Sequence, residues 1–138
     1  MTYINVNLGE EVHEDQPVEE GSYTLIVNTV EEGEAKKSGA PMIKLTHQID
    51  GHPDAALVYH NLVLPKEDDE DKAIRFKNLM LKRYLVLAGA DFESDGFNMD
   101  DLQGMAFEAY LTKEQIDSDD PSAPPQFRNS IVVPRLAE

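Results

Sequence analysis

Apolar and polar residues alternate in five separate stretches of the chain, and one longer stretch repeats apolar residues with a helical period. Alternation every second residue is typical of β-strands, whereas repeats at three and four residues indicate an amphipathic helix. Strands are therefore expected at 22–30, 41–50, 55–65, 105–112 and 126–134, and a helix at 72–89. The segment NMDDLQG (98–104) predicts one short helical turn, capped by Asn98 and ended by Gly104.

The same alternation predicts which side chains face the core. One face of the first strand is expected to hold Tyr23, Leu25, Val27 and Thr29. Phe107 and Phe127 share their faces with apolar neighbours, so we expect both in the core. Tyr59 alternates with Leu57 and is also expected to face inward, which would turn His60 outward.

The order of these elements is three strands, a helix and two strands. This is the order of the OB-fold, a small five-stranded Greek-key barrel. We therefore predict a mainly β domain at 21–138, with one helix between strands three and four that closes an end of the barrel. Residues 1–20 are expected to be an N-terminal arm and acidic linker. The connections at 31–41 and 113–125 would flank the binding face of such a barrel.

Charge is distributed unevenly along the chain. There are 27 acidic residues against 12 Lys and Arg, which gives a formal net charge of −15. A uniformly acidic surface would repel nucleic acid. The acids are clustered, however, in the segments 9–20, 66–71, 91–95 and 114–120. The basic residues lie mainly elsewhere, so a local basic face is compatible with the net charge.

Several classes of function receive no support from the sequence. The absence of cysteine excludes a disulfide framework, a thiolate metal site and a cysteine nucleophile. No apolar run reaches the roughly 18 residues needed to span a bilayer, and the N-terminus does not resemble a signal peptide. No hydrolase, P-loop, zinc-protease or dinucleotide motif is present. We expect a soluble, cytoplasmic protein that is not an enzyme and holds no cofactor or metal.

Six segments together resemble a known family. They are GSYTLIV, KKSGAPMIKLTHQIDG, HNLVLP, LVLAGA, DDLQGMAFEAYL and RNSIVV, within residues 20–134. These segments resemble an uncharacterised family of small bacteriophage proteins, described as single-stranded-DNA-binding proteins and encoded beside replication or recombination genes. The resemblance implies an OB-fold-like protein that binds single-stranded DNA without sequence preference, in the cytoplasm of the infected bacterial host.

Binding of single-stranded DNA requires cations along a groove and aromatic faces on which bases stack. The candidate residues are the cations Lys36, Lys37, Lys44, Lys113 and Arg128 and the rings of Tyr110 and His60. Tyr110 is included because it lies on the strand face opposite Phe107. The expected partners are single-stranded DNA and replication or recombination proteins, with no membrane. The sequence leaves open whether the chain forms a homo-oligomer.

The predicted helix carries its own basic face. That face consists of Lys72, Arg75, Lys82 and Arg83. The acid run EDDED (67–71) is expected to cap the helix and to complement the positive end of its dipole. We expect the basic face to pair with the acid runs at 67–71 and 91–95 rather than with nucleic acid.

The net charge of −15 also favours a second hypothesis for the function. The same acidic barrel could serve as a protein-interaction module or a phage structural module, which binds a protein partner rather than DNA.

Overall fold

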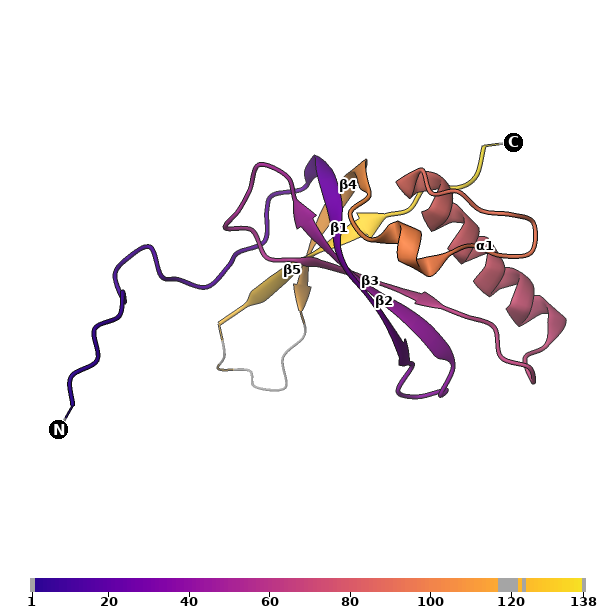
Figure 1. Ribbon diagram of the computed structural model, residues 1–138, viewed down its shortest axis with the longest axis horizontal. Coiled ribbons are helices and arrows are strands. Elements are labelled where there is room, and N and C mark those ends of the chain that lie inside the picture. Colours follow the sequence, from indigo (N-terminus) through magenta and orange to yellow (C-terminus); the bar gives the residue numbers. More distant parts are fainter. Residues whose placement is uncertain (1, 117–121, 123, 138) are drawn as a thin grey trace.

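The computed structural model describes residues 2–116, 122 and 124–137. Its elements are β1 (Gly21–Glu34), β2 (Pro41–Ile49), β3 (Val58–Val63), α1 (Asp71–Ala88), the 3-10 turn η1 (Met99–Leu102), β4 (Ala106–Ile116) and β5 (Gln126–Val132). The five strands form one antiparallel sheet in the order β3-β2-β1-β4-β5, with α1 packed beside it (Figure 1). The predicted fold class, a five-stranded β fold with one helix, is confirmed.

The sheet curls until its two edge strands, β3 and β5, approach each other. No hydrogen-bonded ladder joins these two edges within the described residues, so the sheet forms an open barrel. This strand order is the one expected of an OB-like barrel. Within the described part of the chain, no helix is long and apolar enough to cross a membrane.

A bulge in β1 lies between Val27 and Thr29. An extra residue in a strand moves every following side chain to the other face of the sheet. Thr29 therefore faces outward and its hydroxyl lies 2.6 Å from that of Thr46, while Val30 packs against the core. The prediction that Thr29 shares the face of Leu25 is wrong for this reason.

The two ends of α1 are held differently. Its C-terminus ends at Gly89, whose φ of 73° is left-handed and suits glycine. At the N-terminus, Glu70 occupies the cap position and makes no side-chain cap bond within the described residues. Asp69 instead accepts hydrogen bonds from the Lys66 amide and the Lys77 ammonium group, at 2.8 and 2.6 Å. These bonds lower the pKa of Asp69 and tie the acid run to the helix.

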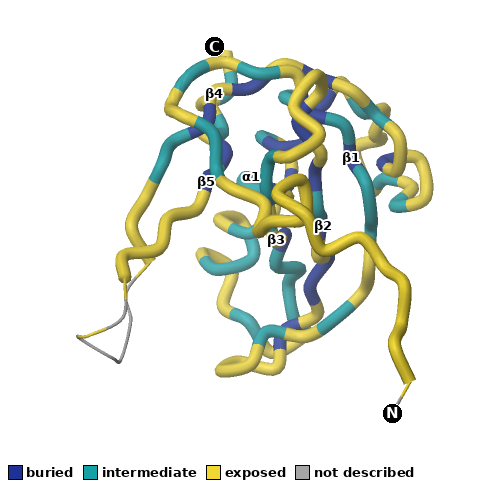
Figure 2. Tube along the Cα trace, turned by 90° about the vertical axis from the view of Figure 1, so that its left-hand side faces the viewer, coloured by how far each residue is buried: buried dark blue, intermediate teal, exposed yellow. Residues whose placement is uncertain are grey.

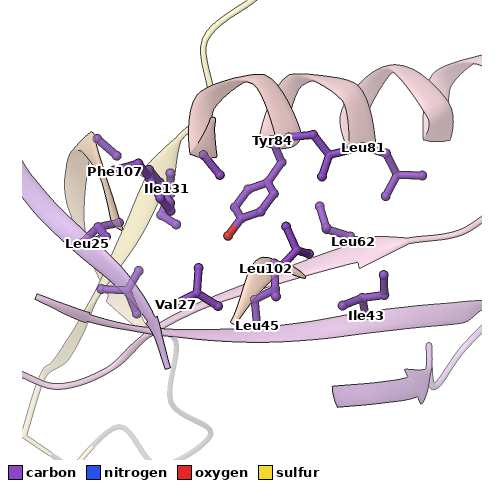
Figure 3. Close-up of a cluster of buried hydrophobic side chains, with 14 of the residues drawn as sticks. Leu25, Val27, Ile43, Leu45, Leu62, Leu81, Tyr84, Leu102, Phe107 and Ile131 are labelled. Atoms are coloured by element: carbon purple, nitrogen blue, oxygen red, sulfur yellow. The ribbon is translucent and has the colours of Figure 1, made fainter. Parts of the chain in front are cut away.

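The buried side of α1 closes the barrel, and its residues are Leu81, Tyr84, Leu85 and Ala88 (Figure 3). The Tyr84 hydroxyl lies 2.7 Å from Nε2 of the buried His47. Nδ1 of this histidine lies 2.9 Å from the Val58 carbonyl. Because a carbonyl can only accept, Nδ1 carries the proton and Nε2 accepts from the Tyr84 hydroxyl. Burial raises the pKa of Tyr84, so the hydroxyl remains a donor.

The substitution Tyr84→Phe should lower the free energy of unfolding by about 1–3 kcal/mol, because it leaves a buried histidine nitrogen without its donor. Urea denaturation measures this loss. The matched control is Tyr59→Phe, which removes the same atom from a side chain that is 69% exposed. The control should change stability by less than about 0.5 kcal/mol. Equal effects of the two substitutions would contradict the role of the Tyr84 hydroxyl.

Candidate nucleic-acid interface

The β1–β2 hairpin carries three of the predicted cations. Lys36 and Lys37 are exposed in its turn, and Lys44 faces outward from β2. The stem of Lys44 crosses Gly33, where an added Cβ would lie only 2.9 Å from the lysine Cε. β1 extends beyond its predicted end, so the turn is shorter than the connection expected at 31–41. The three cations therefore lie on a hairpin with long strands rather than on a long loop.

Tyr59 is an exposed aromatic ring on the outer face of β3. Its partner on β2 is Thr46, and the next outward pair along the two strands joins Asn61 to Lys44. The prediction that Tyr59 faces inward is wrong, since 69% of its surface is exposed. The misleading neighbour was Leu57, which precedes β3. Alternation counted within the strand from Val58 would have found this residue.

His60 faces the core, contrary to the prediction. Its ring stacks on that of Tyr84, with a centroid separation of 5.2 Å and an interplanar angle of 14°. Burial, followed by the neighbouring His47, lowers the pKa of His60 to about 4. His60 is therefore neutral at pH 7 and belongs to the packing beneath α1. It does not belong to the exposed candidate interface.

The β4–β5 hairpin brings together a cation and a second aromatic ring. The Lys113 ammonium group lies 5.2 Å from the centre of the Phe127 ring, a cation–π contact. The prediction that Phe127 is in the core is wrong, because β4 and β5 extend past the barrel at this point and leave the ring 41% exposed. Arg128 faces the opposite side of the hairpin, where its guanidinium lies 3.8 Å from the Glu114 carboxylate.

Tyr110 lies on a different part of the surface. It faces outward from β4 and is 47% exposed, between Ser22 on β1 and Val132 on β5. β1 separates β4 from β2 and β3 in the sheet, so the ring is not brought onto the face that holds Tyr59. Phe107, on the other side of β4, is buried as predicted.

The N-terminal segment is attached to the β4–β5 hairpin by a buried amide. The Asn129 side chain accepts from the Val18 amide and donates to the carbonyls of Val18 and Thr112, all at 2.9 Å. Two residues earlier in the segment, Gln16 forms an isolated bridge with Ala55, which lies just before β3. The segment thus runs between the two edges of the open barrel, a contact that no local sequence pattern indicates.

Acidic residues of the N-terminal segment neutralise Lys113 of the β4–β5 hairpin. The Lys113 ammonium group lies 2.8 Å from a Glu19 carboxylate oxygen, and its amide donates to Glu20. Between the segment and the hairpin is an open groove of 820 Å³, with Phe127 on one side and Asp15 on the other. Any anion that enters this groove must compete with the protein's own carboxylates.

The basic face of α1 does not pair with the acid runs, contrary to the prediction. That face was predicted to consist of Lys72, Arg75, Lys82 and Arg83. None of them forms an ion pair within the described residues, which include both acid runs concerned. Lys77 instead binds Asp69. Four helix cations are left available on an otherwise acidic protein.

These features define an OB-like barrel with exposed cations and an aromatic ring on its β2–β3 face. Over residues 5–115 the chain matches the family model described as "Protein of unknown function (DUF669)". The chain therefore belongs to this family, whose description assigns no activity. A search of curated proteins finds no match.

The buried histidines should make the protein less stable as the pH falls. Because the folded-state pKa of His60 is about 4, below its ordinary value, the unfolded state takes up a proton first. The pKa of His47 is lowered in the same direction. The contribution of these neutral histidines to the free energy of unfolding is fully present above about pH 6.5 and declines towards pH 4. For His60 the loss at pH 5 is roughly 1–2 kcal/mol.

Urea denaturation at pH 7 and pH 5 measures this decline. The substitution His60→Phe, which keeps a ring against Tyr84, should reduce the difference between the two pH values. The control substitution His13→Gln, at an exposed position, should leave that difference unchanged. If His60→Phe leaves the pH dependence as it is in the wild type, the buried neutral histidine is not its source.

Proposed function

We propose that this protein binds single-stranded DNA without sequence preference, in bacteriophage replication or recombination in the cytoplasm of the infected host. The main support is the exposed ring of Tyr59 beside the cation Lys44 on the outer face of β2 and β3. In OB-folds this face and its two flanking connections bind oligonucleotides. Here one flanking hairpin carries Lys36 and Lys37, and the other carries Lys113 beside the Phe127 ring.

The chemistry of these groups suits a single strand of any sequence. Lysines attract phosphates at every step of the backbone, whereas each base offers a π-face for stacking. Stacking on Tyr59 or Phe127 would contribute roughly 1–3 kcal/mol per base. Each phosphate contact would add about −0.7 to the slope of log K against log salt. Binding is therefore expected to be weak at physiological salt and much stronger at low salt.

Fluorescence anisotropy with a labelled oligo-dT of about 12 nucleotides, which fits one OB barrel, tests the proposal. We expect micromolar binding at low salt that weakens steeply as salt is added. Lys36→Glu together with Lys37→Glu should weaken binding at least tenfold, and Tyr59→Ala by about 5- to 100-fold through lost stacking. Tyr59→Phe should keep most of the affinity.

The matched control reverses two charges elsewhere, at Lys72 and Arg75 on α1. Lys72→Glu together with Arg75→Glu changes the net charge by the same amount as the hairpin pair. This control should bind the short oligonucleotide as the wild type does. No binding by the wild type at tens of micromolar protein would refute the proposal, and equal losses in both double variants would refute the location.

A second prediction concerns the acids that neutralise Lys113. Because a phosphate must displace Glu19, Glu19→Gln with Glu20→Gln should raise the affinity for oligo-dT by roughly three- to tenfold at low salt. The control pair Glu10→Gln with Glu11→Gln removes two charges from an exposed segment and should have a smaller effect. Equal gains in both pairs would show that only the net charge matters.

One observation favours the alternative, an acidic module that binds a basic protein partner. β1 places Glu31 opposite Lys44, and Glu32 and Glu34 follow on the same strand. These acids would repel phosphates near the candidate face. Affinity purification from infected cells, with and without nuclease, distinguishes the two functions. A partner kept after nuclease treatment, together with no affinity for oligo-dT, would favour the protein-binding module.

A further inference from the structure

The solvent side of α1 combines cations with exposed apolar side chains. Phe76 is 61% exposed and Val86 is 52% exposed. Lys72, Arg75 and Lys82 follow at spacings that place them on the same side of the helix. We call these five residues the α1 stripe. Its three cations form no ion pair within the described part of the chain, so the stripe is available to a partner.

Arg83 adjoins the stripe and forms no ion pair within the described part of the chain. Its Nε atom is buried and has no hydrogen-bond partner among the described residues. Because this atom is covered by the protein's own atoms, a molecule that docks on the stripe cannot supply its acceptor.

The N-terminal segment has the opposite character. Residues 2–15 run away from the barrel as an exposed arm, which makes a turn where the Val12 amide donates to the Gly9 carbonyl (Figures 1 and 2). Its first part exposes apolar side chains: Tyr3, Ile4, Val6 and Leu8. Its second part is acidic, with Glu10, Glu11, Glu14 and Asp15. An exposed apolar cluster of this kind often marks an interaction site.

The apolar parts of the arm and the stripe match in length. At about 3.3 Å per residue, an extended arm places Ile4 about 13 Å from Leu8. At about 1.5 Å per residue, α1 places Phe76 about 15 Å from Val86. The arm can therefore lie along the helix with one apolar side chain near each apolar residue of the stripe.

The charges match in the same alignment. If Leu8 lies against Phe76, the acids Glu10 and Glu11, in the turn that directly follows Leu8, lie near the start of the helix. Lys72 lies one helical turn before Phe76, on that side. Acidic side chains of the arm would thus meet Lys72 and its neighbour Arg75 at this end of the stripe, which is the complementarity expected of a specific interface.

The arm does not reach the helix of its own chain in this structure. Figure 1 shows the N-terminus and α1 at opposite ends of the molecule, and the segment is fixed to the barrel from Gln16 onwards. We propose that the N-terminal arm of one copy binds the α1 stripe of a second copy. This contact joins two different surfaces, so it can repeat and build rings or short chains.

Sedimentation velocity of the full-length, nuclease-treated protein tests this proposal over a range of about 1–300 μM, which brackets micromolar affinity. The average mass should rise with protein concentration and fall as salt is added. The arm variant Ile4→Ser with Leu8→Ser and the stripe variant Arg75→Glu with Phe76→Ser should each associate at least about tenfold more weakly. The control Arg128→Glu, which reverses a charge on β5, should associate as the wild type does.

Mixing the two variants gives the decisive result. The stripe variant keeps an intact arm and the arm variant keeps an intact stripe, so an equimolar mixture should form 1:1 dimers and nothing larger. A wild type that stays monomeric, a mixture that stays monomeric, or a stripe variant that associates normally would each overturn the proposal. All substitutions are at exposed positions, and an unchanged urea midpoint verifies the fold. If the stripe variant loses oligo-dT binding but still associates, the stripe contacts nucleic acid instead.

Discussion

The packing of Tyr84 from α1 into the barrel is the interaction through which the helix and the sheet depend on each other. Its ring is fully buried, and it meets rings from three strands: His47 on β2, His60 on β3 and Phe107 on β4. Since side chains alternate along a strand, the inward position of His60 turns Tyr59 to solvent. The packing beneath α1 thus determines which ring of β3 is available to a ligand, although the helix itself lies on another side of the barrel.

The surface that results is divided by charge. The two hairpins hold cations, the β4–β5 hairpin also holds the Phe127 ring, and carboxylates of the N-terminal segment already neutralise Lys113. An anionic ligand of this face would have to compete with those acids for Lys113. Apart from Lys77, which binds Asp69, the cations of α1 face elsewhere and have no acidic partner within the described residues. The distribution thus separates the two surfaces for which we propose binding on one small acidic barrel.

Local patterns were sufficient for the order of strands, for the position of α1 and for the Asn98 cap, whose side chain accepts from the Asp100 amide at 3.1 Å. The side of the sheet to which individual side chains point was harder to predict. The bulge after Val27 and the inward position of His60 depend on contacts with distant strands. Asn129 binds a residue 111 positions away, and no local signal indicates such a contact. The candidate cations were named from the sequence, whereas the exposure of the Tyr59 ring was not predicted.

Binding of a single strand across β2 and β3 is tested most directly by following backbone amide signals in an NMR titration with oligo-dT at low salt. We expect saturable shifts that cluster at Lys36, Lys37, Lys44 and Tyr59 and extend to the hairpin of Lys113 and Phe127. The amides of α1 should shift little with a short oligonucleotide. An absence of shifts, or shifts confined to α1, would contradict the proposed interface.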